Sequence, residues 1–259
     1  MIVKEHHQSD SSINQEKEPV VLIDNLTKSF GDNHVLRGFS CKLYAGENLA
    51  ILGKSGSGKS VLIKCMVGLL PYESGTAKVL GKEVAGLNQQ DLDLLRGDIG
   101  FLFQGSALYD SMTVRGNLEF PLRRSYLEKK EEKEMDLKIK DVLESVGLSG
   151  TEDLMPEELS GGMKKRIALA RTLIINPKII LYDEPTSGLD PITSKGISRL
   201  MVEVQQKYKA SSLIITHDVE CARTVANRII ILSDGINYAE GTFDELNRSE
   251  DPTVSAFFH

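Results

Sequence analysis

The sequence contains no tryptophan, only three cysteines and no long apolar run. The cysteines Cys41, Cys65 and Cys221 are widely spaced and odd in number, which argues against a disulfide framework or a zinc site and favours a reducing compartment. No apolar run approaches the roughly 18 residues that a membrane-spanning helix needs, and residues 1–7 are too polar for a signal peptide. We therefore expect a cytoplasmic protein that reaches a membrane only through a partner.

Basic residues are also not in excess over acidic ones. The 259 residues are 41% hydrophobic and 26% charged, with a formal net charge of −6. This composition is ordinary for a globular protein, and the charge gives no field that would attract nucleic acid. Residues 1–18 are polar and charged, so we expect a flexible arm there and one folded domain over residues 19–259.

Residues 53–60 carry the most specific pattern in the chain, G-x-x-x-x-G-K-S. An apolar run at 49–52 precedes it and a helix-compatible run at 61–67 follows it, which is the strand–loop–helix context of a phosphate-binding P-loop rather than of a chance glycine-rich turn. Glycines let several N–H groups point at one phosphate, and the helix adds its positive end. We expect Lys59 to reach the β- and γ-phosphates and the Ser60 hydroxyl to bind Mg²⁺.

Apolar runs at 20–23, 99–103, 179–182, 213–216 and 229–232 predict further strands, and residues 39–43 alternate as a half-exposed antiparallel strand does. Residues 26–31 should connect the first two strands. Residues 107–158 lose the β-branched runs and predict a mainly helical insertion, which we place at about 105–165. Helices are expected over 163–175, from Asp190–Pro191 to about Tyr208, and after Asp251–Pro252.

Four of the expected strands end in polar residues that handle phosphate or water: the P-loop, Gln104, Asp183 with Glu184, and His217. Because ligands bind at the carboxyl ends of strands in an open parallel sheet, we expect one crevice to collect them. Asp183 should hold Mg²⁺ through water with Ser60 as a direct ligand. Glu184 could accept a proton from the attacking water. His217 could contact the γ-phosphate, and the Gln104 amide oxygen could touch Mg²⁺ or the water.

A second anion-binding arrangement precedes the helix at 163–175. Ser160, Gly161 and Gly162, here called the serine–glycine loop, would present exposed N–H groups and a positive helix end. Since the P-loop already serves the phosphates of its own chain, a second such loop predicts that two chains face each other. Each serine–glycine loop would then cap the ATP of the other chain.

With these motifs in this order, residues 20–250 resemble the nucleotide-binding subunit of an ABC transporter. The resemblance implies an α/β fold: a RecA-like P-loop core with a small antiparallel β subdomain and an inserted α-helical subdomain. It implies a head-to-tail homodimer with two ATP molecules between P-loop and serine–glycine loop, an adenine stacked on Phe30, and Asp190 at the dimer seam. The expected ATP-contacting residues are Phe30, Gly53, Lys54, Ser55, Gly56, Ser57, Gly58, Lys59, Ser60, Val61, Ser160, Gly161, Gly162 and Asp190, with Ser60, Gln104 and Asp183 at Mg²⁺.

Met163 stands where this family usually has glutamine. With residues 102–109 and 190–193, the run Met163–Lys164–Lys165–Arg166 resembles the ATPase subunit of MCE-associated lipid transporters. That resemblance implies transport of phospholipids between bacterial membranes, a membrane permease, an MCE lipid-binding protein, in some systems a small STAS-domain subunit, and a place on the cytoplasmic face of the inner membrane. It also puts a permease helix against residues 105–121, where we expect Arg115 to be exposed.

Other functions fit less well. ABC ATPases of DNA repair or chromosome organisation carry long coiled-coil or zinc insertions, and translation-factor ABC proteins have two cassettes and a basic linker. A P-loop kinase would need neither the serine–glycine loop nor His217. An ABC importer or exporter for another substrate remains the nearest alternative, because the ATPase subunit does not touch the cargo.

Overall fold

The computed structural model describes residues 18–125 and 132–258. Apart from Glu18, the expected N-terminal arm lies outside the described residues, as does the start of the charged run at 128–140. Within the described ranges, no helix is both long enough and apolar enough to cross a membrane.

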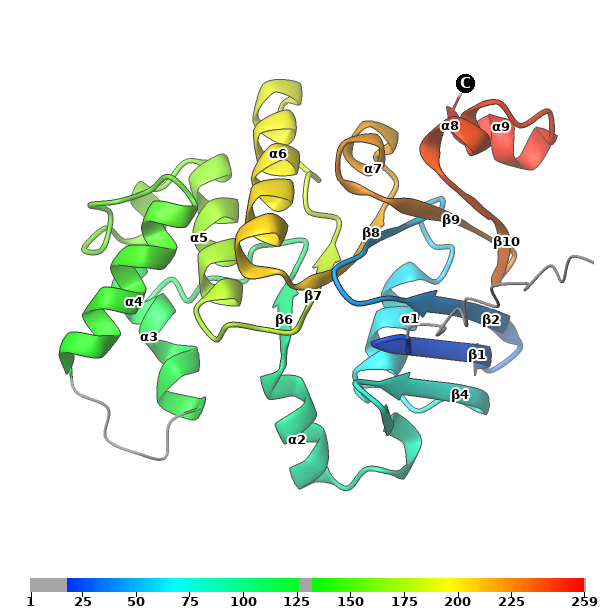
Figure 1. Ribbon diagram of the computed structural model, residues 1–259, viewed down its shortest axis with the longest axis horizontal. Helices are drawn as coiled ribbons and strands as arrows, with labels where there is room; N and C mark the ends of the chain where they lie inside the picture. Colours follow the sequence, from blue (N-terminus) through cyan, green and yellow to red (C-terminus); the bar gives the residue numbers. More distant parts are fainter. Residues whose placement is uncertain (1–17, 126–131, 259) are drawn as a thin grey trace, which may run out of the picture.

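A six-stranded sheet forms the centre of the molecule, with strand order β10-β9-β3-β8-β7-β6 (Figure 1). Five neighbouring strands run parallel and β10 pairs antiparallel with β9. The P-loop, Gln104 and His217 follow members of the parallel set and Asp183 ends another member, so the predicted shared edge is confirmed. The strand bounds are Asn48–Leu52 for β3, Ile99–Leu102 for β6, Ile179–Asp183 for β7, Ser211–Thr216 for β8, Arg228–Ser233 for β9 and Ile236–Gly241 for β10.

A second, antiparallel sheet has the order β2-β1-β4-β5. Its strands are β1 (Val21–Phe30), β2 (Asn33–Leu43), β4 (Ser74–Val79) and β5 (Lys82–Glu83). The expectation that residues 26–31 form a connection was wrong, because β1 continues to Phe30. The register shifts between Ile23 and Leu26, and Asn25 between them has a positive φ of 49°. This irregularity breaks the apolar alternation without ending the strand.

Helices α3 (Val114–Ser125), α4 (Glu132–Ser145) and α5 (Gly161–Leu173) gather at one end of the molecule, opposite the antiparallel sheet (Figure 1). The predicted fold is thus confirmed: a RecA-like core with a β subdomain and a helical part. The serine–glycine loop leads directly into α5, which begins at Gly161 rather than at the expected residue 163. The remaining helices are α1 (Lys59–Met66), α2 (Gln89–Gly97), α6 (Pro191–Tyr208), α7 (Val219–Val225), α8 (Phe243–Asn247) and α9 (Pro252–Phe258), with short 3₁₀ turns at Val84–Gly86 and Pro156–Glu158.

Two hydrophobic cores lie on opposite faces of the central sheet. Along β3, Leu49 and Ile51 belong to the core shared with α1 and the antiparallel sheet, whereas Ala50 and Leu52 belong to the core shared with α3–α7. Successive side chains of a strand point to opposite faces, so a strand covered on both sides reads as one apolar run. This packing holds the polar residues that follow the strands at one rigid edge.

Candidate nucleotide-binding site

The P-loop connects β3 to α1 along a path that leaves little room for a side chain at two points. A Cβ atom at Gly53 would lie 2.4 Å from Ser57 Oγ, and one at Gly58 would lie 2.7 Å from Val35 Cγ1. Gly58 also has a φ of 100°, which side chains rarely adopt, and it is the residue before α1. The loop therefore curls tightly enough to present its N–H groups at the start of the helix.

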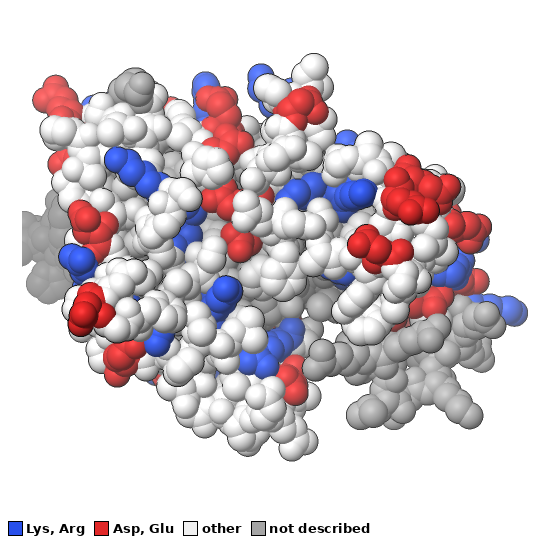
Figure 2. All heavy atoms as spheres, turned by 180° about the vertical axis from the view of Figure 1, so that it is seen from behind, with Lys and Arg blue, Asp and Glu red and all other residues white. Residues whose placement is uncertain are grey.

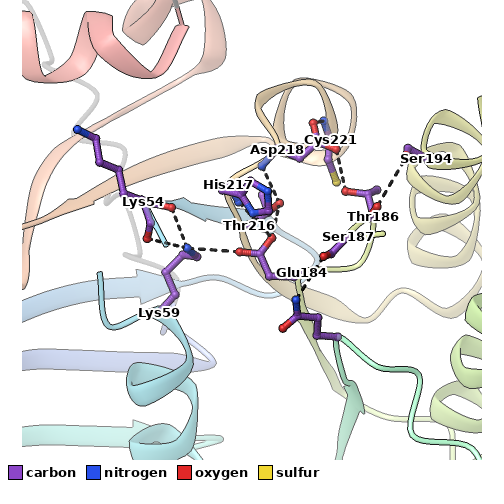
Figure 3. A network of polar contacts seen from close by, with 12 residues as sticks. Lys54, Lys59, Glu184, Thr186, Ser187, Ser194, Thr216, His217, Asp218 and Cys221 are labelled. Carbon is purple, nitrogen blue, oxygen red and sulfur yellow. Dashed lines mark hydrogen bonds and ion pairs between the residues drawn. The ribbon is translucent and has the colours of Figure 1, made fainter. Parts of the chain in front are cut away.

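Lys59 is buried at the bottom of this loop, with only 6% of its surface exposed. Its ammonium donates to the carbonyls of Gly53 at 2.7 Å and Lys54 at 3.1 Å, and lies 3.3 Å from Glu184 Oε1 (Figure 3). The Lys59 ammonium thus lies where a phosphate held by the P-loop would bind, and it is paired with the Glu184 carboxylate.

Glu184 follows β7 in a left-handed conformation with φ 48°. Its Oε2 accepts hydrogen bonds from the His217 backbone N–H and the Thr216 hydroxyl, each at 3.2 Å, and lies 2.8 Å from His217 Nδ1 (Figure 3). A non-glycine residue in this conformation is strained, and such strain persists only where the surroundings fix it. One carboxylate oxygen is therefore held by β8 and His217, while the other faces Lys59.

A chain of hydroxyls behind Glu184 was not predicted from the sequence. The fully buried Thr216 hydroxyl also accepts from Asp218 N–H at 3.0 Å, and the Asp218 carboxylate accepts from the Thr186 hydroxyl at 2.7 Å (Figure 3). The bonds from Thr216 to Glu184 and from Thr186 to Asp218 each join residues 32 positions apart in sequence, so only the fold brings these groups together. Together these hydrogen bonds hold the Glu184 side chain in one orientation.

Asp183 and Ser60 fit a divalent cation. Asp183 Oδ1 is buried without a hydrogen-bond partner among the described residues. Burial raises the pKa of the Asp183 carboxyl, and the charge of Glu184 raises it further, against smaller lowering effects of Lys59 and the Ser60 hydroxyl. An unpartnered carboxylate oxygen beside a serine hydroxyl is the hard oxygen donor set that Mg²⁺ prefers. When bound there, Mg²⁺ would neutralise charge on the phosphates.

Gln104 is exposed, and its amide donates to Ser187 Oγ at 3.3 Å. Its main-chain carbonyl accepts a hydrogen bond from the ammonium of Lys165, a buried residue of α5 that sequence reasoning missed. Burial lowers the pKa of Lys165, opposed by the nearby charges of Asp183 and Glu184. Since a lysine within a charged helix usually faces solvent, nothing in the sequence signalled this contact.

One cavity of about 740 Å³ collects most of the predicted residues. Phe30 stands at its rim with 48% of its surface exposed and Lys28 Nζ 5.1 Å from the ring centre. Gly53, Ser57 and Asp183 are not among the residues that line this cavity. The lining residues are Phe30, Val35, Lys54, Ser55, Gly56, Gly58, Lys59, Ser60, Val61, Gln104, Glu184 and His217.

The serine–glycine loop and Asp190 do not line this cavity. Ser160 caps α5, accepting from Met163 N–H at 3.3 Å, and Asp190 caps α6, accepting from Ile192 N–H at 3.0 Å. The two caps are neighbours, since a Cβ at Gly162 would lie 2.7 Å from Thr193 Cγ2. Met163 is half-buried and packs against the hydrophobic core. It thus makes an apolar packing contact at a position where glutamine is usual. Ser160, Gly161 and Asp190 are exposed. None of the three lines the P-loop cavity of its own chain.

On the face seen in Figure 2, acidic side chains gather at the right-hand side, whereas acidic and basic side chains are interspersed over the rest of a largely uncharged surface. Charge on that face therefore marks no basic surface for a phosphate group. The arrangement that stands out is chemical: a P-loop lysine, two carboxylates, a histidine and a glutamine around one cavity.

Comparison with known proteins agrees with this geometry. The profile of the ABC transporter family matches residues 36–187. The methionine import ATP-binding protein MetN of Clostridium tetani is 39% identical over 213 residues, covering 82% of this chain and 66% of that protein. The chloroplastic protein TRIGALACTOSYLDIACYLGLYCEROL 3 of Arabidopsis thaliana is 39% identical over 262 residues, covering 93% and 74%. This chain thus matches about two thirds to three quarters of these relatives' lengths.

A solved structure supports the same assignment. The ATP-binding cassette MJ0796, determined as a dimer in a post-hydrolysis state with ADP and Pi, superposes with a TM-score of 0.78 at 31% identity. The match covers 86% of this chain and 98% of the cassette. The P-loop cavity, the family profile and these likenesses agree, and the chain belongs to the ABC transporter family as an ATP-binding subunit that hydrolyses ATP.

Proposed function

We propose that two copies of this chain bind two ATP molecules, each between the P-loop of one copy and the serine–glycine loop of the other. The carrying observation is that the P-loop cavity lacks the second anion-binding loop, which instead lies exposed beside Asp190. Ile192, two residues on, is 85% exposed, as suits an apolar residue that a partner covers. The dimeric state of MJ0796 supports the pairing of two copies.

The proposed chemistry follows from the contacts around Glu184. The P-loop N–H groups and Lys59 hold the phosphates, and the exposed Phe30 ring stacks on the adenine. Ser60 and Asp183 hold Mg²⁺, with Gln104 beside it. Glu184, its direction fixed by Thr216 and His217, accepts the proton of the attacking water, while His217 contacts the γ-phosphate.

A permease helix is the proposed occupant of a groove at the edge of the helical part. Phe103, Tyr109 and Phe120 are each 40–43% exposed, and with Arg171 they line a cavity of about 370 Å³, here called the aromatic groove. The Tyr109 and Phe120 rings lie 4.8 Å apart, centre to centre. Exposed aromatics around a hollow suit the apolar face of a helix. Arg115 is not part of this groove: it is half-buried and paired with Asp136 of α4.

Lipid is the proposed cargo. One relative at 39% identity is named for trigalactosyldiacylglycerol, a lipid, and the run 163–166 supports the same subfamily. The chain would then work on the cytoplasmic face of the inner membrane with a permease and an MCE lipid-binding protein, and in some systems a STAS-domain subunit. The second candidate is methionine import, favoured by MetN at the same identity.

The deciding experiment is purification of the tagged chain from solubilised membranes, with mass spectrometry of the proteins and lipids that accompany it. The complex is then reconstituted into vesicles and given labelled phospholipid or labelled methionine. ATP-dependent transfer of phospholipid supports the lipid cargo. Uptake of methionine without lipid transfer would overturn it while leaving the transporter ATPase in place.

A further inference from the structure

Helix α5 holds the loop that follows β6 at two points. Lys165 donates to the carbonyl of Gln104, and six residues later the Arg171 guanidinium donates to the carbonyls of Ser106 at 3.1 Å and Ala107 at 2.7 Å. Ser106 and Ala107 both have positive φ values, 61° and 50°. Two successive strained residues keep their shape only where other groups hold them. Residues 104–107, here called the Gln104 loop, are therefore clamped to α5.

Lys165 is the part of this clamp that reaches the nucleotide site. The residue is 4% exposed, while Gln104 beside it is exposed and lines the P-loop cavity. Within the described part of the chain, its ammonium donates to the main-chain carbonyl of Gln104, in the loop after β6. An ammonium is costly to bury, and an apolar side chain would fill the same space at lower cost. Packing alone therefore does not account for a lysine here.

We propose that Lys165 is a positioning residue that couples the Gln104 loop to the serine–glycine loop through α5. The inference rests on the proposed function, in which Gln104 meets Mg²⁺ or the attacking water and Ser160 caps the partner's ATP. Ser160 is the N-cap of α5, and Lys165 lies five positions later on that helix. A shift of Gln104 toward bound nucleotide is thus carried by the ammonium to α5, and by α5 to the loop that faces the second ATP.

The absence of tryptophan permits a direct measurement on the full chain. Phe103 precedes Gln104, is 43% exposed and stacks on Phe101 with ring centres 4.1 Å apart. Phe103→Trp introduces a single indole that reports on the Gln104 loop. Its emission is recorded while Mg²⁺ and ATP are added, and ATP binding is measured separately by calorimetry.

Lys165→Met in this background removes the donor at similar length, and Lys165→Arg keeps one. We expect the ATP-dependent change of emission to disappear with Met and to persist with Arg, while the ATP dissociation constant stays within about threefold of the parent. Loss in both variants, or in neither, overturns the proposal. The control Lys207→Met removes a lysine that bonds Asp141 and Ser145 far from the cavity, and it should leave the emission change intact.

Steady-state kinetics give the second readout. Lys165→Met should lower kcat by about tenfold, as expected for one lost hydrogen bond to a charged group, with little change in KM. A rise in KM alone would overturn the positioning role.

Should Lys165→Met fail to fold by circular dichroism, Lys165→Gln, whose amide is too short to reach Gln104, takes its place with the same outcomes. If the parent chain shows no ATP binding, the proposed function fails; binding without any dependence on Lys165 sinks only this inference.

Discussion

Glu184 receives more contacts from the surrounding residues than the expected role of a base requires, and that makes its variants informative. Glu184→Gln keeps the shape and, through its amide oxygen, the hydrogen bonds to Thr216 and His217, but it loses the ion pair with Lys59 and cannot accept a proton. ATP should still bind, while hydrolysis should fall by about 10²- to 10⁴-fold. Phosphate release by the purified chain or its permease complex measures this. Glu203→Gln, on the exposed face of α6, is the matched control. Hydrolysis at the native rate by Glu184→Gln would remove the base assignment.

Thr216 is predicted to act through Glu184. Thr216→Val keeps the buried shape and removes the hydroxyl that bonds Glu184 Oε2, so hydrolysis should fall by about tenfold. Thr216→Ser retains the hydroxyl and should recover most of the rate. Equal losses in both variants would mean that packing, and not the hydrogen bond, is responsible.

Asp183 carries a stability cost that depends on pH. Its folded pKa is raised, first by burial, so the ionised carboxylate opposes folding above that pKa and the opposition fades as pH falls to the unfolded value. Asp183→Asn should therefore raise the melting temperature of the free chain at neutral pH, by about 2–4 °C for each kcal/mol gained, with the gain shrinking toward acid. Melting curves between pH 4 and 8 test this. The same variant should lose Mg²⁺-dependent ATP hydrolysis. A lower melting temperature at pH 7 would contradict the sign.

Sequence reasoning at this scale predicted which residues lie together where a residue's position in an element sets its place. Lys59, Glu184 and His217 each lie next to an apolar strand or inside a motif of fixed geometry. It failed for Lys165 and Thr216, whose partners Gln104 and Glu184 lie 61 and 32 positions away. It also missed Asn117, whose fully buried side chain bonds main-chain groups of Tyr109, Met112 and Thr113 in the turn just before its helix. Such contacts have no pattern along the chain.

At the scale of elements, the aromatic groove replaces Arg115 as the test of permease binding. Phe120→Asp places a charge among apolar rings, so a permease helix should no longer bind, whereas ATP affinity should not change. Leu137→Asp makes the same exchange at a residue of α4 that is 68% exposed, and serves as control. Co-purification from membranes and calorimetry with ATP give the two readings. Retained permease with Phe120→Asp would place the contact elsewhere.

The elements that the sequence did not reveal are short or irregular. Helix α2 buries only Leu95, so its apolar periodicity is weak. Strand β10 alternates exposed and half-buried residues at the sheet edge, and α8 is five residues long. The long buried strands were predicted correctly because packing on both faces demands continuous apolar runs. The boundaries proposed for the arm and for the helical insertion stay predictions.

For the whole molecule, the sandwich of two chains makes a covalent prediction. The native cysteines are all buried and unpaired, so replacing them by alanine leaves a background for new thiols. Ser55→Cys and Ser160→Cys, both exposed, should be joined between chains by a short bis-maleimide reagent, which alkylates both thiols, when Mg²⁺ and ATP are added to the Glu184→Gln form in its transporter. Gel electrophoresis shows a species of twice the mass. With ADP, or with Lys59→Ala, the band should weaken. Its absence with ATP in the assembled transporter would count against the shared site.

The ion pair between Lys59 and Glu184 sets a hidden competition for ATP. The ammonium must exchange a carboxylate for phosphate, so the affinity of the native chain is a difference between two attractions. Glu184→Gln removes the internal rival together with the base. The variant should therefore bind ATP more tightly than the native chain does, and the gain should be smaller for ADP, which lacks the γ-phosphate. An ATP affinity measured on the Glu184→Gln variant would then be higher than the affinity of the native, hydrolysing subunit.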